Sequence, residues 1–112
     1  MNKKLMTETK IYVGLNDAES RKQEHATGRY VNILKQVCNS YKVPFSFSIN
    51  QGGYIHEDGE YTEETTIVIS MIDADKELVN EIAKDLCVLF RQESVMITEE
   101  HVKTYFVSES IE

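Results

Sequence analysis

The order of apolar patterns along this 112-residue chain predicts a ferredoxin-like α+β fold with the element order β-α-β-β-α-β. Four stretches alternate apolar and polar residues, as half-buried strands do, and two carry apolar residues at helical spacing. A hairpin signal lies near the middle of the chain. This order is typical of a four-stranded antiparallel sheet with two helices on one face.

The length suits one domain with a single core, and 41% of the residues are apolar, enough for that core to pack. Residues 1–8 are polar and predict a flexible N-terminus. Residues 9–108 then form the domain, and residues 109–112 form an acidic tail.

The first strand is predicted over residues 10–15, where every second residue is apolar. Ser20 and Gln23 have the spacing of a capping box, which favours an early helix start, but Gly28 weakens the first turns. The firm helical stripe has steps of three and one and comprises Tyr30, Ile33, Leu34, Val37, Cys38 and Tyr41.

Two strands in the middle, residues 45–49 and 65–72, are expected to form a long hairpin around the dipeptide Asp58-Gly59. An Asp-Gly pair favours a two-residue type I′ turn. Counted back from that turn, Phe47 and its apolar neighbours would face the wrong side of the partner strand. A one-residue bulge corrects the register, and Gly52-Gly53 is where we expect it.

With that bulge, four side chains at the far end of the hairpin share one face: Tyr54, His56, Tyr61 and Glu63. We take them as the candidate binding site. An imidazole beside a carboxylate can exchange protons near neutral pH, yet such cross-strand pairs are also ordinary sheet surface. The four residues therefore predict a partner or subunit surface, a solvated hairpin or a ligand pocket.

The second helix is expected after Asp73 or Asp75, either of which can cap it. The last strand is expected to begin near Glu93 and to be interrupted at residues 98–100. The apolar stripe of this helix comprises Leu78, Val79, Ile82, Ala83, Leu86, Leu89 and Phe90.

The charge balance, 19 acidic against 12 basic residues, argues against non-specific nucleic-acid binding, which rests on neutralising phosphates. No segment has the pattern of a secretory signal or a membrane span, so we expect a cytosolic protein. Cys38 and Cys87 are expected as buried free thiols. No cofactor or metal motif and no catalytic constellation is found.

Three stretches together resemble a family of small, uncharacterised ferredoxin-like domains. They are "KIYVGLN" at the first strand, "GGYIHEDGEYTEETTIVI" at the hairpin, and "LFRQESVMI" before the last strand. The family shares a Tyr-x-Gly-Leu strand, a Gly-rich hairpin ending in Glu, and a Phe-x-Gln-Glu-Ser-Val junction, here residues 90–95. The resemblance implies the fold and no particular activity. At that junction, Gln92, Glu93 and Ser94 are polar. Glu93 and Ser94 are expected to satisfy open backbone groups at a helix end, and a ligand-binding role for the junction is the alternative.

These observations predict a small acidic binding or interaction protein that is not an enzyme and that forms homo-oligomers. Its sheet face or its aromatic and acidic hairpin would contact the partner. One such role is that of an inhibitor of a basic protein, of the phage or mobile-element type. The alternative is a protein that binds or converts a small molecule in a pocket around His56, of the dimeric α+β-barrel type.

Overall fold

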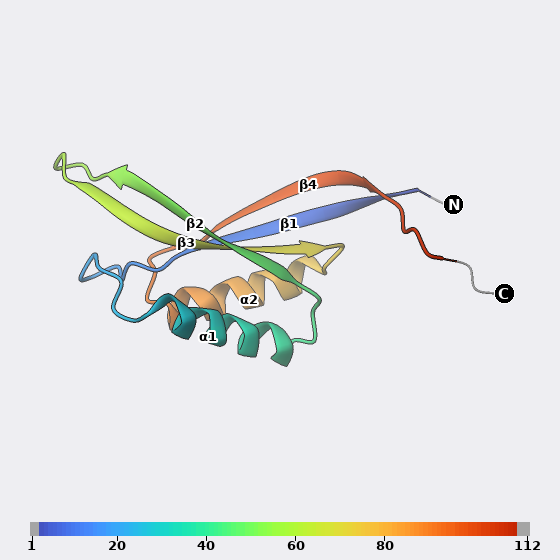
Figure 1. The fold of residues 1–112 in the computed structure, drawn as a ribbon, viewed down its shortest axis with the longest axis horizontal. Helices are drawn as coiled ribbons and strands as arrows, with labels where there is room; N and C mark the ends of the chain where they lie inside the picture. Colours follow the sequence, from blue (N-terminus) through green and yellow to red (C-terminus); the bar gives the residue numbers. More distant parts are fainter. Residues whose placement is uncertain (1–2, 110–112) are drawn as a thin grey trace.

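A computed structural model describes residues 3–109 and shows the predicted ferredoxin-like fold (Figure 1). The four strands form one antiparallel sheet in the order β2-β3-β1-β4, and both helices pack on the same face of it. The elements are β1 (Lys4–Gly14), α1 (Thr27–Ser40), β2 (Ser46–Ile55), β3 (Tyr61–Ile72), α2 (Lys76–Leu89) and β4 (Met96–Thr104).

The core lies between the helices and the middle of the sheet. The predicted helical stripes supply it, with Tyr30, Leu34 and Cys38 from α1 and Val79, Ile82, Ala83 and Leu86 from α2. The sheet supplies side chains at alternate positions, which therefore share one face: Ile11, Val13, Ile67, Ile69 and Met71. Full burial of one such aliphatic side chain contributes about 1.5–3 kcal/mol, so this layer is the main source of stability.

Strand β1 begins earlier than the sequence predicts. Residues 4–8, expected to be part of a flexible N-terminus, pair with β4 from Lys4 opposite Thr104 onward. Strand β4 is likewise continuous through residues 98–100, where an interruption was expected. These segments extend past the helices, so both of their faces are open and they need no alternating apolar pattern. Of the predicted tail, residues 110–112 lie outside the described part.

The prediction of a bulge at Gly52-Gly53 is wrong, because β2 has no bulge there. Pairing of β2 with β3 is unbroken from Ser46 opposite Ser70 to Ile55 opposite Tyr61. The additional residue lies in the turn: the amide of His56 donates to the carbonyl of Glu60 over 2.9 Å, which leaves a three-residue loop. Gly59 has a φ of 86°, the positive value that such a loop requires at its last residue. The turn thus performs the register correction.

The molecule is elongated, 61 Å long and 27 by 26 Å across. The β2–β3 hairpin extends beyond the helices at one end, and the paired β1 and β4 extend beyond them at the other (Figure 1). No helix in residues 3–109 is long and apolar enough to cross a membrane. Cys38 is a buried free thiol as predicted, and burial raises its pKa to about 11, whereas Cys87 is only partly buried.

Candidate functional site: a polar cavity at the base of the hairpin

The four predicted site residues do not share a face. Direct pairing puts Tyr54 opposite Thr62, and Gly53 opposite Glu63. Tyr61 and Glu63 therefore lie on the face that carries the core, while Tyr54 lies on the other face. The His56 side chain lies on the same face as Tyr54, since its Nε2 is 2.9 Å from Oγ1 of Thr62, the residue that pairs with Tyr54. The expected face rested on a bulge that is absent, and a one-residue change of register moves a side chain to the opposite face.

Tyr61 has a different neighbour from the one predicted. Its ring lies across Gly53, where a Cβ atom would overlap the phenol. The absence of a side chain at Gly53 therefore makes room for Tyr61 and does not form a bulge.

Tyr54 and His56 instead line a cavity of about 380 Å³, which we call the hairpin cavity. Its other walls come from two segments far away in sequence, the loop after β1 and the junction between α2 and β4. The residues of these walls are Asn16, Asp17, Ala18, Arg21, Gln92, Glu93 and Ser94, and the hairpin adds Glu64 from β3. Polar and charged side chains from three segments thus converge on one space.

Glu64 is held in a defined position in this cavity. The amide of Asn16 donates to Glu64 Oε2 over 3.0 Å, and Asn16 Nδ2 donates to the carbonyl of Glu63 over 3.0 Å. The Glu64 side chain lies across Gly14, where a Cβ atom would overlap its carboxylate. Gly14 is therefore required for the close approach of this carboxylate to β1.

The junction after α2 is fixed by side chain to backbone hydrogen bonds. Gln92 Nε2 donates to the carbonyl of Asn16 over 2.5 Å and to that of Phe90 over 3.3 Å. The amide of Gln92 bonds the carbonyl of Cys87, and Cys87 Sγ donates to the carbonyl of Gln92 over 3.1 Å. The backbone role is thus performed by Gln92 and not by Glu93 or Ser94, for which it was predicted. Glu93 is exposed and lines the cavity.

The hairpin tip closes over the loop after β1. Arg21 Nη1 lies 3.7 Å from Asp58 Oδ2 in an ion pair between the two segments. The amide of Glu60, which donates to Asp58 Oδ1, lowers the pKa of Asp58, and the nearby Arg21 and His56 lower it further. The rings of Tyr54 and His56 meet edge to face at 4.5 Å. The cavity is therefore bounded on its outer side by charged and aromatic groups.

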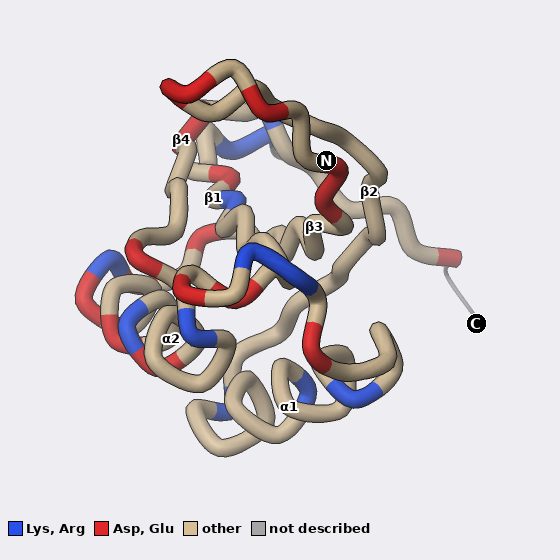
Figure 2. The backbone as a smooth tube through the Cα atoms, turned by 90° about the vertical axis from the view of Figure 1, so that its left-hand side faces the viewer, with Lys and Arg blue, Asp and Glu red and all other residues tan. Residues whose placement is uncertain are grey.

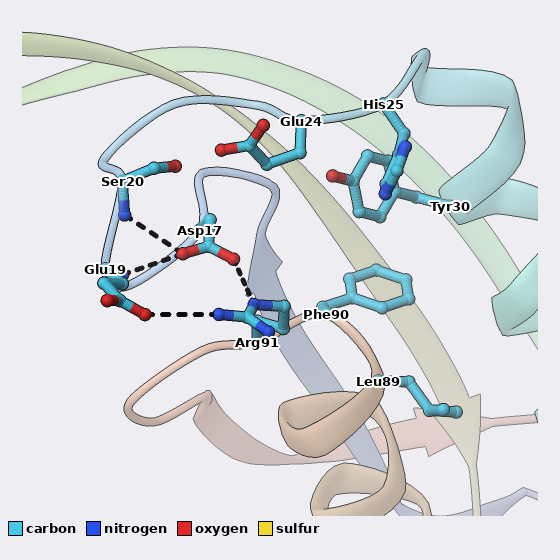
Figure 3. A pocket seen from close by; sticks show the side chains of 9 residues that line it. All are labelled: Asp17, Glu19, Ser20, Glu24, His25, Tyr30, Leu89, Phe90 and Arg91. Atoms are coloured by element: carbon cyan, nitrogen blue, oxygen red, sulfur yellow. Dashed lines mark hydrogen bonds and ion pairs between the residues drawn. The ribbon is translucent and has the colours of Figure 1, made fainter.

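A second cavity, of about 580 Å³, lies on the other side of the same loop (Figure 3). We call it the helix-end cavity, because the end of α2 and the start of α1 form its floor. Its lining comprises Asp17, Glu19, Ser20, Glu24, His25, Tyr30, Leu89, Phe90 and Arg91. Asp17 lines both cavities and is almost completely buried.

The Asp17 carboxylate ties the loop to the end of α2. Its Oδ1 accepts hydrogen bonds from the amides of Ser20, over 3.1 Å, and Glu19, over 2.8 Å. Its Oδ2 pairs with the guanidinium of Arg91 (Figure 3). The amides of Ser20 and Glu19, and then Arg91, lower the pKa of Asp17, so the carboxylate stays charged at neutral pH.

Acidic residues gather at this end of the molecule. Figure 2, viewed from the hairpin end, shows them on the hairpin tip and on the loop before α1, with a short basic stretch on that loop. Among residues 3–109, no group of three or more His, Cys, Asp and Glu side chains is placed to hold a metal ion.

Sequence reasoning assigned no function to Asn16 and Glu64. The signal was nevertheless present, because the three stretches that carry the family resemblance meet here. The first ends in Gly14-Leu15-Asn16, the second contains Tyr54 and Glu64, and the third contains Gln92, Glu93 and Ser94. Stretches that lie apart in the sequence, at residues 10–16, 52–69 and 89–97, thus become the walls of one cavity.

No family model and no curated protein matches the chain. Solved structures do match. A phage SAM lyase in complex with S-methyl-5′-thioadenosine is 23% identical, with a TM-score of 0.66, over 86% of this chain and 81% of the lyase. A phage SAM lyase in its apo state is 24% identical, with a TM-score of 0.66, over 95% and 92% of the two chains. The GlnK–ATP complex of B. subtilis is 16% identical, with a TM-score of 0.56, over 88% and 82%. At these identities the similarity establishes the fold.

Proposed function

We propose that this chain binds S-adenosylmethionine (SAM) in the hairpin cavity and cleaves it as a lyase. The observation that carries the proposal is the convergence of Tyr54, the fixed carboxylate of Glu64, and Glu93 in one cavity. Two similar folds, a SAM lyase and GlnK, are described in complex with adenosine-containing ligands. This is the small-molecule alternative predicted for a pocket around His56, with a different set of polar residues.

The charge of the cavity favours a cationic ligand over a polyphosphate. Three carboxylates line it, from Asp17, Glu64 and Glu93, against one cation, Arg21. Asp17 is paired with Arg91 and Arg21 with Asp58, which leaves Glu64 and Glu93 as the unneutralised charges. Like charges in a partly closed site repel, so the phosphates of ATP would bind poorly. SAM carries a sulfonium and an ammonium group against one carboxylate, and its net positive charge is complementary to this lining.

The size and the aromatic content of the cavity fit a nucleoside. A volume of about 380 Å³ lies within the usual range of ligand sites, about 300–1,000 Å³. Tyr54 lines the cavity and is 44% exposed, so an adenine could reach part of its ring. Stacking of a base on an aromatic side chain is worth about 1–3 kcal/mol.

The proposed reaction breaks the bond between the sulfonium sulfur and Cγ of the aminobutyrate chain. The sulfur takes the electron pair and becomes the neutral thioether of S-methyl-5′-thioadenosine. In a lyase no water enters, so the carboxylate oxygen of SAM itself forms the new bond to Cγ and closes a lactone. Glu93 and Glu64 would hold the ammonium and the sulfonium, which keeps the chain bent for this ring closure.

Calorimetric titration tests the binding. SAM is expected to bind more tightly than S-adenosylhomocysteine, which lacks the sulfonium charge, and ATP is expected not to bind. Glu64→Gln should weaken SAM binding about tenfold, since a charge-assisted contact is worth about 1.5 kcal/mol. Glu99→Gln, an exposed acid on β4, is the matched control.

Chromatography tests the cleavage. SAM incubated with the protein should yield S-methyl-5′-thioadenosine and homoserine lactone in equal amounts. Binding without product would reduce the proposal to a SAM-binding protein, and equal affinity for SAM and ATP would contradict it.

A second candidate function, a protein-interaction surface, is supported by the outer part of the hairpin. Ile55 is 70% exposed and Tyr61 is 61% exposed, beyond the cover of the helices. Apolar side chains gathered at such a tip are typical of contact surfaces. We propose that copies of this chain associate through the hairpin, and a basic protein remains the alternative partner. We propose in addition that the protein is located in the cytosol, as the sequence predicts.

Analytical ultracentrifugation tests this second function. The double variant Ile55→Ser, Tyr61→Ser should sediment as a smaller species than the wild-type protein at equal concentration. A wild-type protein that sediments as a monomer at all concentrations would exclude self-association through the hairpin.

A further inference from the structure

The helix-end cavity is larger than the hairpin cavity, and the proposed function does not use it. Its floor is aromatic: the rings of Tyr30 and Phe90 meet edge to face at 5.1 Å, and His25 lies 5.9 Å from Tyr30. Leu89, which is 52% exposed, adds an apolar wall. These contacts fix the rings, so the cavity is formed in the absence of a ligand.

The rim of this cavity has an excess of negative charge. Asp17, Glu19 and Glu24 line it together with one guanidinium, that of Arg91. Arg91 is already engaged, because it pairs with Asp17 and lies 3.4 Å from Glu19 (Figure 3). Glu24 has no ion-pair partner within residues 3–109. One carboxylate is therefore left to receive a cation.

The carboxylate of Glu24 lies close enough to the Asp17–Arg91 ion pair to influence the pKa of Arg91. Asp17 is the main cause of the raised pKa of Arg91, and the negative charges of Glu19 and Glu24 add to it. Figure 3 shows Glu24 on the loop that passes over the cavity, between Asp17 and the side of Tyr30. An unpaired carboxylate and an aromatic floor thus bound one volume.

We propose that the helix-end cavity binds a small organic cation, an amine or a guanidine attached to an aryl or alkyl group. The ammonium or guanidinium would pair with Glu24, and the apolar part would contact Leu89 and the edges of Tyr30 and Phe90. Cations are attracted to carboxylates, whereas an anion would meet three of them. Tyr30 and Phe90 are almost completely buried and offer only their edges to the apolar part. The volume of about 580 Å³ accommodates such a molecule.

The site is separate from the hairpin cavity. Asp17 is the one residue that lines both, and the Arg91 side chain paired with it lines the helix-end cavity only. SAM is itself an organic cation, so the experiment has to distinguish the two sites.

The test is a titration of the isotope-labelled protein with benzylamine, followed by amide chemical shifts in NMR spectra. Benzyl alcohol and benzoate, which have nearly the same shape but no charge or the opposite charge, are the matched probes. Benzylamine should give saturable shifts at residues 24–30 and 89–91, benzyl alcohol should bind at least about fivefold more weakly, and benzoate should give no shifts. Equal binding of benzylamine and benzyl alcohol would overturn the charge argument.

Two variants and a competition complete the design. Glu24→Gln should weaken benzylamine binding about fivefold, and Leu89→Ser should weaken it by a similar factor through loss of apolar contact. Glu99→Gln, exposed and remote on β4, should leave it unchanged. Unchanged binding in both cavity variants would overturn the assignment, as would displacement of benzylamine by SAM.

Discussion

Strand β3 passes through two different environments. At its C-terminal end, Ile67, Ile69 and Met71 are at most 1% exposed beneath the helices, whereas at its N-terminal end Tyr61 is 61% exposed. The pairing with β2 is the same at both ends. The comparison teaches that this fold separates the stabilising core from the proposed binding surfaces along one hairpin, because helices cover only part of it. The hairpin cavity lies at the border between the two parts.

The largest effect is expected in the covered part. Ile69→Ala removes a fully buried side chain and should lower the free energy of unfolding by about 2–5 kcal/mol, through lost burial and the cavity left behind. Ile55→Ala in the uncovered part should change it by no more than about 0.5 kcal/mol. Urea unfolding of both variants measures the contrast, and similar losses in the two would contradict it.

At the border, Gly14→Ala is expected to displace the Glu64 carboxylate, with which a Cβ atom would overlap. Loss of the hydrogen bond between the Asn16 amide and Glu64 should cost about 1 kcal/mol of stability, and SAM binding should fall as in Glu64→Gln. The matched control is Gly52→Ala, because no atom lies within 4 Å of a Cβ atom there. If both alanine variants bound SAM equally well, the role assigned to Gly14 would be wrong.

A smaller effect, present at neutral pH and lost in acid, is expected at Asp17. Its pKa is lowered in the folded protein, so its contribution to stability is present above its ordinary value of 3.8 and is lost as the pH falls through the folded value. The melting temperature of Asp17→Asn should therefore be below that of the wild type at pH 7, and the gap should narrow below about pH 4. A gap independent of pH would show that Asp17 acts by packing alone.

The smallest effect concerns reactivity and leaves stability unchanged. Burial raises the pKa of Cys38 from 9.0 to about 11, so at pH 7.5 its thiolate fraction is about a hundredfold lower than that of an ordinary thiol. N-ethylmaleimide should therefore modify Cys87, which is only partly buried, well before Cys38. Mass spectrometry of the modified peptides measures the order. Faster modification of Cys38 would mean that the core opens more readily than the end of α2.

Prediction from the sequence succeeded where burial of one face requires apolar residues at regular spacing along a helix or strand. The stripe on α1 and the alternation in β3 each placed apolar residues on the face that the core covers. It failed at residues 4–8 and at residues 98–100, where strand pairing proceeds with both faces open and no apolar period is required. Strand limits outside the core depend on a neighbouring strand, which a local pattern does not contain.

For the candidate site, the segments that the sequence singled out do line the hairpin cavity, but the four residues chosen do not share a face. The hairpin, the first strand and the Gln92-Glu93-Ser94 junction were all marked by their motifs, and Tyr54 and His56 do line the cavity. Tyr61 and Glu63 do not, because the register correction occurs in the turn. The position of one additional residue decided which side chains could meet.

The sequence by itself determined the fold class, the two helices and the strands over the core, because apolar periodicity reflects which face of each element is buried. Only the tertiary structure decided the register of the hairpin and the convergence of Asn16, Glu64 and Glu93. The physical reason is that Glu64 reaches the cavity by lying across Gly14 and bonding the Asn16 amide, contacts that span about 50 residues. Such contacts exist only once β1 and β3 are paired.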